Sequence, residues 1–160
     1  MTEGAPQPLY SVDSSAFMDW QARFYPVDVF TSILERVEML VVAKRFLAPA
    51  LVREELGIVG TPDLTAWADA HKPIFVPTGE LLAEAQTIQS RFPGLRDPKA
   101  EYEEADAYVI ALAKLRGGIV ITQETPAAEK HKPKRSHFIP DVCREMGVPT
   151  VAVYSECDRA

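Results

Sequence analysis

Short apolar runs alternate with helical segments along most of this 160-residue chain. The expected strands are residues 9–12, 46–48, 119–122 and 149–153, of which 119–122 is the most strongly β-branched. Strands that alternate with helices usually form a parallel sheet, because each crossover places a helix over the sheet. The pattern therefore predicts an α/β fold in three layers, with a central parallel sheet flanked by helices.

Apolar residues at spacings of three and four mark the helices. The first pattern opens at Pro26 and continues through Val27, Phe30, Leu34, Val37 and Val41. A second helix is expected to open at Pro49, and others cover residues 64–70, 81–92, 104–116 and 141–146. We expect Gly117 and Gly118 to end the helix before them.

Length and composition indicate one domain over residues 1–160, with residues 1–8 as a flexible N-terminal segment. No stretch approaches the ~18 apolar residues of a membrane span, and the first residues lack the features of a signal peptide. A cytoplasmic protein without a membrane partner is expected. The net charge of −6 argues against a general nucleic-acid coat protein, which relies on a broad cationic surface.

Four acidic residues lie where a predicted strand ends or within a predicted helix: Asp13, Glu55, Asp106 and Glu124. Such residues would meet at one edge of a parallel sheet, where open α/β sheets place their active sites. Crowded carboxylates repel one another unless a cation joins them, and oxygen ligands suit Mg²⁺ or Mn²⁺. The pattern predicts that these four residues bind a divalent metal.

Each acidic residue also has a structural interpretation. Asp106 is suited to cap a helix, and Asp13 to form a turn with the serines that follow it. Glu124 could be an ordinary surface carboxylate, and Glu54 competes with Glu55 as the ligand. As a set, the four residues fit phosphodiester hydrolysis, in which two cations about 4 Å apart activate water and neutralise the leaving oxygen.

The motifs around these carboxylates resemble those of PIN-domain proteins, the nuclease superfamily that includes the VapC-type toxins. The resemblance lies in residues 10–15, the pair Glu55 and Leu56, and residues 105–113 and 119–124. A narrower resemblance, to a PIN-like family of uncharacterised bacterial proteins, rests on residues 24–30, 63–68 and 139–143. Together these motifs cover nearly the whole chain, from residue 10 to residue 153.

The resemblance implies a metal-dependent endoribonuclease that acts on structured RNA. Asp13, Glu55 and Asp106 match the three acidic positions of the superfamily, whereas the fourth is often Asp and is Glu124 here. Further residues could assist the site, and these are Ser15, Thr122 and Asp141. Asp141 is equally well explained as an acidic residue at a helix start.

Residues 129–137 form a basic, polar segment that we expect to be a solvated loop. Its cations, Lys130, Lys132, Lys134 and Arg135, could hold RNA phosphates beside a metal site. A charge run of this kind is more often only solvated.

The predicted function is that of the toxin in a toxin–antitoxin pair, a ribonuclease with Mg²⁺ or Mn²⁺ at its acidic site. Its expected partners are RNA, an antitoxin protein and a second copy in a homodimer. Aromatic residues of the first helices suggest such an interface, namely Phe17, Trp20, Phe24, Tyr25 and Phe30. The alternative is a non-catalytic PIN-like module that binds RNA or protein.

Overall fold

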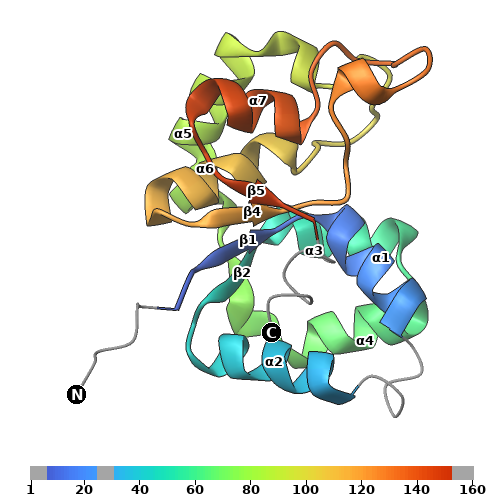
Figure 1. Cartoon of the computed structure of the whole chain (residues 1–160), viewed down its shortest axis with the longest axis vertical. Coiled ribbons are helices and arrows are strands. Elements are labelled where there is room, and N and C mark those ends of the chain that lie inside the picture. The colour runs from blue at the N-terminus through green and yellow to red at the C-terminus, as the bar shows by residue number, and fades with distance from the viewer. Residues whose placement is uncertain (1–6, 25–30, 153–160) are drawn as a thin grey trace.

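A computed structural model of the chain describes residues 7–24 and 31–152, except for the side chains of residues 22–24, 31 and 33. Its centre is a sheet with the strand order β3-β2-β1-β4-β5, in which every neighbouring pair is parallel. The strands are β1 (Tyr10–Val12), β2 (Phe46–Pro49), β3 (Phe75–Val76), β4 (Ile119–Ile121) and β5 (Thr150–Val151). The predicted α/β class with a parallel sheet is confirmed (Figure 1).

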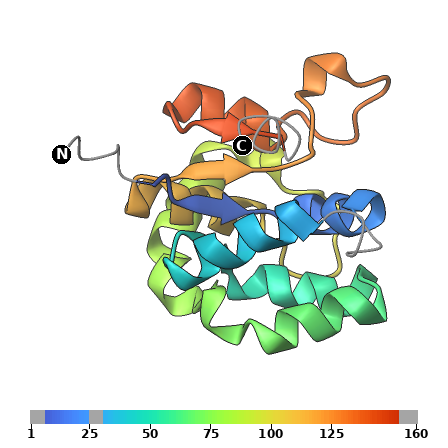
Figure 2. The same ribbon diagram turned by 60° about the horizontal axis from the view of Figure 1, so that its bottom comes forward.

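Helices cover both faces of this sheet. On one side lie α1 (Ser14–Phe24), α2 (Thr31–Val42), α3 (Ala50–Val59) and α4 (Pro62–Ala70). On the other side, α6 (Asp106–Arg116) packs on β1, β2 and β4, with α5 (Thr78–Arg91) and α7 (Ile139–Met146) against it (Figures 1 and 2). Short 3₁₀ turns complete the chain: η1 (Lys72–Ile74), η2 (Pro93–Leu95) and η3 (Ala127–Glu129).

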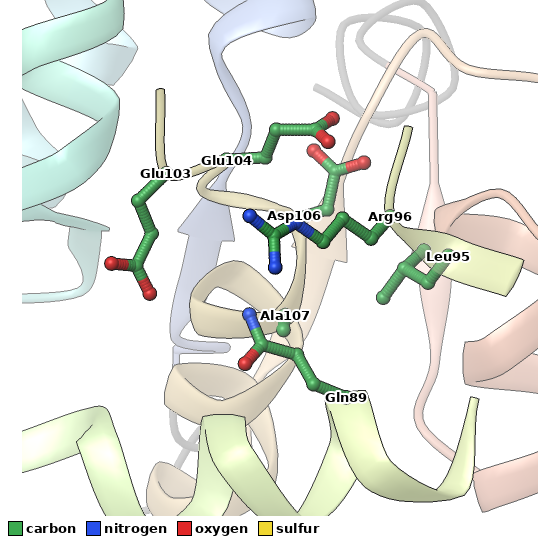
Figure 3. A pocket seen from close by; sticks show the side chains of 7 residues that line it. All are labelled: Gln89, Leu95, Arg96, Glu103, Glu104, Asp106 and Ala107. Atoms are coloured by element: carbon green, nitrogen blue, oxygen red, sulfur yellow. The ribbon is translucent and has the colours of Figure 1, made fainter. Parts of the chain in front are cut away.

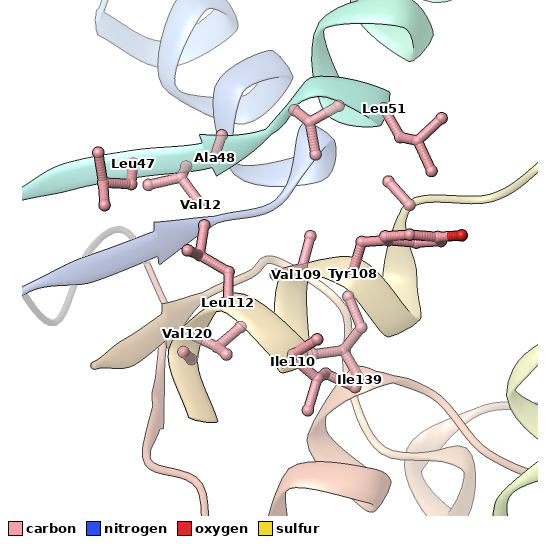
Figure 4. Close-up of a cluster of buried hydrophobic side chains, with 14 of the residues drawn as sticks. Val12, Leu47, Ala48, Leu51, Tyr108, Val109, Ile110, Leu112, Val120 and Ile139 are labelled. Atoms are coloured by element: carbon pink, nitrogen blue, oxygen red, sulfur yellow. The ribbon is translucent and has the colours of Figure 1, made fainter. Parts of the chain in front are cut away.

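Helix α6 forms the centre of the core. Every residue from Asp106 to Ala113 is buried, and the apolar ones pack with Val12, Leu47 and Val120 of the strands (Figure 4). A helix that is apolar on all sides must be covered on all sides, here by the sheet, α5 and α7. The buried N-terminus of α6 is thereby fixed at the carboxyl edge of the sheet.

The sequence patterns located most elements but not all of their bounds. The first helical pattern was expected to open at Pro26, yet residues 25–30 lie outside the described residues, and α2 is described from Thr31. Helix α6 begins at Asp106, two residues later than expected. Strand β3 was not predicted because Pro73 and Pro77 flank it, and proline is tolerated only at the edge of a sheet, where β3 lies.

The aromatic residues that suggested an interface are divided by the structure. Phe17 is fully buried and packs against the ring of Phe46 at 5.8 Å between centroids, so it cannot form the expected aromatic surface. Trp20 is partly buried and contacts Trp67. Tyr25, Phe30 and the side chain of Phe24 lie outside the described residues. Within residues 7–24 and 31–152, no helix has the length and apolar character needed to cross a membrane.

Candidate functional site

Three helix N-termini meet the carboxyl edge of the sheet. Helix α1 follows β1 through Asp13, and α6 begins at Asp106 against the same strands. After β4 the chain continues through Thr122 to Glu124, whose side chain reaches the start of α7. Helix N-termini carry partial positive charge, so this edge favours carboxylates.

Asp13 is held by the hydroxyl groups around it. Its Oδ2 accepts hydrogen bonds from Ser15 Oγ at 2.6 Å and from Thr122 Oγ1 at 3.1 Å. The backbone amides of Ser14 and Ser15 also donate to this carboxylate, which is only 2% exposed. Asp13 directly precedes helix α1, and Ser15 and Thr122 fix the orientation of its carboxylate.

Glu55, and not Glu54, belongs to this group of carboxylates. Its Oε2 accepts from Ser14 Oγ at 2.7 Å, and its Oε1 accepts from the backbone amide of Ala105 at 2.7 Å, just before α6. Glu54 points from the same helix into solvent and is exposed. Glu55 thus links the start of α1 with the start of α6.

Asp106 faces a guanidinium group. Its Oδ2 accepts from Arg135 Nη1 at 2.8 Å, and the same nitrogen lies 3.6 Å from Glu104 Oε2. Arg135 Nη2 donates to Glu124 Oε1 at 3.2 Å, while Glu124 Oε2 accepts from the amide of Ile139 at 3.0 Å. Arg135 therefore joins three carboxylates that come from two segments of the chain.

These carboxyl groups influence one another's ionisation. Burial raises the pKa of Asp106 well above its ordinary value, and the charges of Glu124 and Asp13 raise it further, against the opposing effect of Arg135. Burial is also the main cause of the raised pKa values of Asp13, Glu55 and Glu124. The charge of Asp13 adds to the increase at both glutamates. One guanidinium therefore does not offset the negative charge of the group.

A cavity of about 110 Å³ opens beside Asp106, between α5, η2 and the start of α6. Figure 3 shows that the carboxylates of Glu104 and Asp106 point to the same side of it, with the Arg96 side chain close by. Its lining residues are Gln89, Leu95, Arg96, Glu103, Glu104, Asp106 and Ala107. Of the four predicted site residues, only Asp106 lines this cavity.

Two predicted auxiliary positions differ in their setting. Thr122 lies within the site, since its hydroxyl group donates to Asp13 and accepts from the amide of Glu124 at 3.1 Å. Asp141 instead accepts from the amides of Phe138 at 2.9 Å and Ala127 at 3.0 Å, so it caps α7 and holds the preceding loop. Its helix-start interpretation accounts for these contacts.

The structure separates the four cations of the basic segment. Lys132 and Lys134 are exposed, and Lys130 lies over the ring of Phe138 at 4.4 Å. The side chain of Arg135 is only 13% exposed and points to the carboxylates instead of the solvent. We had expected it on a solvated loop, but buried negative charge and the Phe138 ring, also at 4.4 Å, draw it inward.

The donor atoms of this group fit Mg²⁺ or Mn²⁺ in kind, because all are hard carboxylate oxygens with few competing ligands. The Arg135 guanidinium already acts there as a stand-in cation for Asp106 and Glu124. Across the described ranges 7–24 and 31–152, however, no three His, Cys, Asp or Glu side chains are arranged to hold a metal ion. Carboxylate oxygens would have to turn from their present partners for a metal to bind.

Two contributors to this site, Ser14 and Glu104, were not predicted, and Arg135 was predicted only as an RNA-binding cation. Ser14 and Glu104 belong to no motif of their own, and only their closeness in sequence to Asp13 and Asp106 points to the site. The inward position of Arg135 depends on residues far along the chain, including the carbonyl group of Leu95, which accepts from Arg135 Nη1 at 2.8 Å. The presence of one arginine among three lysines was the only hint in the sequence.

Comparisons with known proteins identify a family and a similar structure. Residues 10–159 match the family described as a domain of unknown function, DUF4411. The crystal structure of PAE2754 from Pyrobaculum aerophilum is similar with a TM-score of 0.46 and 17% sequence identity. The similarity covers 95% of this chain and 96% of that chain. No curated protein matches this chain significantly.

Proposed function

This chain belongs to the DUF4411 family, and we propose that it is a metal-dependent endoribonuclease of the PIN-domain type. The observation that supports this proposal is the convergence of Asp13, Glu55, Asp106 and Glu124 at the carboxyl edge of the sheet. Burying several carboxylates together costs free energy unless they bind a cation or take part in a reaction. Phosphodiester hydrolysis makes use of such a group.

In this proposal, the four carboxylates hold one or two Mg²⁺ or Mn²⁺ ions, which activate water and neutralise the leaving oxygen. Ser15 and Thr122 orient Asp13 through their hydroxyl groups, and Ser14 orients Glu55. These hydroxyl groups fix the direction of the carboxylates before substrate arrives, and such fixed ligands bind metal more tightly.

The proposed substrate is RNA, and the proposed biological role is that of a cytoplasmic toxin neutralised by an antitoxin protein. Lys132 and Lys134 are exposed on the loop that leads to Arg135, where they would contact flanking phosphates. These contacts add affinity without sequence preference. Purification of this chain from its own cells tests the antitoxin assignment, because a small antitoxin protein should be recovered bound to it.

The nuclease proposal is tested by RNA cleavage with Glu55→Gln and a matched control, Glu54→Gln. Both changes remove one negative charge from α3, but only Glu55 contacts Ser14 and Ala105. Cleavage in Mn²⁺ should fall at least about 100-fold in Glu55→Gln, since even residues that support ligands matter by 10–100-fold. Glu54→Gln should cleave like the wild type, and cleavage that resists a chelator would contradict the proposal.

A second candidate function is a non-catalytic module that binds RNA or protein. It is favoured by one observation, that each of the four carboxylates has protein partners in the structure: hydroxyl groups, helix amides or Arg135. In that case the group would serve only to join helix ends. Absence of Mn²⁺ binding together with intact RNA binding would favour this candidate.

A further inference from the structure

Arg135 occupies the place where a cation would be expected in the carboxylate group. We propose that Arg135 is a displaceable internal counter-ion, which holds the group closed and leaves when a divalent cation enters. The inference rests on the proposed function in one respect, because it assumes that these carboxylates bind a metal. It adds that the chain itself controls access to the site.

The contacts of Arg135 use oxygens that a metal would need. Its Nη1 binds Asp106 Oδ2 at 2.8 Å and its Nη2 binds Glu124 Oε1 at 3.2 Å. The second oxygen of Glu124 is already bound by the amide of Ile139. Metal coordination by Glu124 therefore competes directly with Arg135, and two cations so close together would also repel each other.

A divalent cation has the advantage in charge. Arg135 brings one positive charge to the three carboxylates of Asp106, Glu124 and Glu104. A divalent ion brings two charges and accepts six or more oxygen ligands. Exchange of the guanidinium for such an ion therefore improves the charge balance of the group.

The segment that carries Arg135 lies outside the helices and strands. Between η3 and α7 the chain has no helix or strand, and its residues 131–134 are all exposed. Lys132 adopts a left-handed backbone conformation with φ of 52°, which is uncommon for a residue with a side chain. Arg135 is thus held by its side-chain contacts and by neighbours such as His137, whose amide donates to Gly94 O at 3.3 Å.

Mn²⁺ titration of the full chain by calorimetry tests this inference with Arg135→Gln and the control Lys134→Gln. Both variants lose one positive charge from neighbouring positions, but Lys134 is exposed. If Arg135 competes with the metal, Arg135→Gln should bind Mn²⁺ about tenfold more tightly than the wild type, within the usual range of coupling between two sites. Lys134→Gln should bind like the wild type.

The other outcomes separate this inference from the proposed function. Equal, measurable affinity in wild type and Arg135→Gln would overturn the competition and leave the metal site intact. Absence of Mn²⁺ binding in both proteins would overturn the inference together with the metal-dependent function. Equal tightening in both variants would show a general charge effect and would also overturn the inference.

Hydrogen exchange on the wild type gives a second test, which stands even if Arg135→Gln does not fold. Saturating Mn²⁺ should speed exchange of the His137 amide, which donates to the carbonyl group of Gly94, because the segment loses the contacts of Arg135, and should leave exchange within α6 unchanged. Unchanged or slower exchange of the His137 amide would overturn the proposal.

Discussion

The N-terminal turns of α6 and α7 each contain a buried aspartate, yet their surroundings differ. Asp141 in α7 binds two backbone amides, those of Phe138 and Ala127, which belong to the fixed architecture. Asp106 in α6 binds the side chain of Arg135, and burial together with the neighbouring carboxylates raises its pKa. An aspartate that caps its own helix is therefore structural, whereas an aspartate that is paired with a displaceable cation is a candidate functional residue.

The largest expected effect on stability comes from Asp141→Ala. This change leaves two backbone amides without a partner at the start of α7, and each buried amide without a partner costs about 1–3 kcal/mol. We expect a loss of at least about 2 kcal/mol in the free energy of unfolding, measured by urea denaturation. The loss should be the same with and without Mn²⁺. A loss that Mn²⁺ reverses would contradict the distinction between a structural Asp141 and a functional Asp106.

A pH series with Asp106→Asn tests the second aspartate of this comparison. The raised pKa of Asp106 means that the folded state holds its proton more tightly than the unfolded state. The stabilisation that results is fully present below the ordinary pKa of 3.8. It is lost as the pH rises through the raised pKa of the folded state. Relative to wild type, Asp106→Asn should therefore become more stable as pH rises from 4 to 7.

Each unit by which the folded pKa exceeds its ordinary value corresponds to about 1.4 kcal/mol, so urea denaturation at several pH values should resolve the trend. Asparagine keeps an acceptor oxygen for Arg135, which limits other effects of the change. A constant difference between variant and wild type across the series would show that Asp106 is not a repelled carboxylate.

The smallest effect concerns the exposed part of the basic segment. Replacing Lys132 and Lys134 with Ala should reduce the slope of log RNA affinity against log salt by about 0.7 for each lost phosphate contact. Because both side chains are exposed, the free energy of unfolding should stay within about 0.5 kcal/mol of the wild type. Filter binding across a salt series measures the slope, and an unchanged slope would mean that the segment is only solvated.

The parallel sheet could be predicted from the sequence because its central strands are short apolar runs, which are the clearest local pattern in the chain. It also placed Asp13 and Glu124 at one edge, since parallel strands end on the same side. Glu55 and Asp106 lie in helices that begin at the same edge. Strand β3 was missed because its two residues lie between prolines and are fixed by pairing with β2. The inward position of Arg135 was missed because it depends on Leu95 and Asp106, which lie 40 and 29 residues before it in the chain.

The carboxylates around Asp106 are proposed to bind a divalent cation, and a thermal shift with Mn²⁺ measures this binding. Mn²⁺ at a hundredfold excess over its dissociation constant should stabilise the wild type by about 2.7 kcal/mol, since it binds only the folded state. The shift should persist in Asp141→Asn and disappear in Asp106→Asn, provided that both variants fold. Absence of any shift in the wild type, or an equal shift in Asp106→Asn, would contradict the claim.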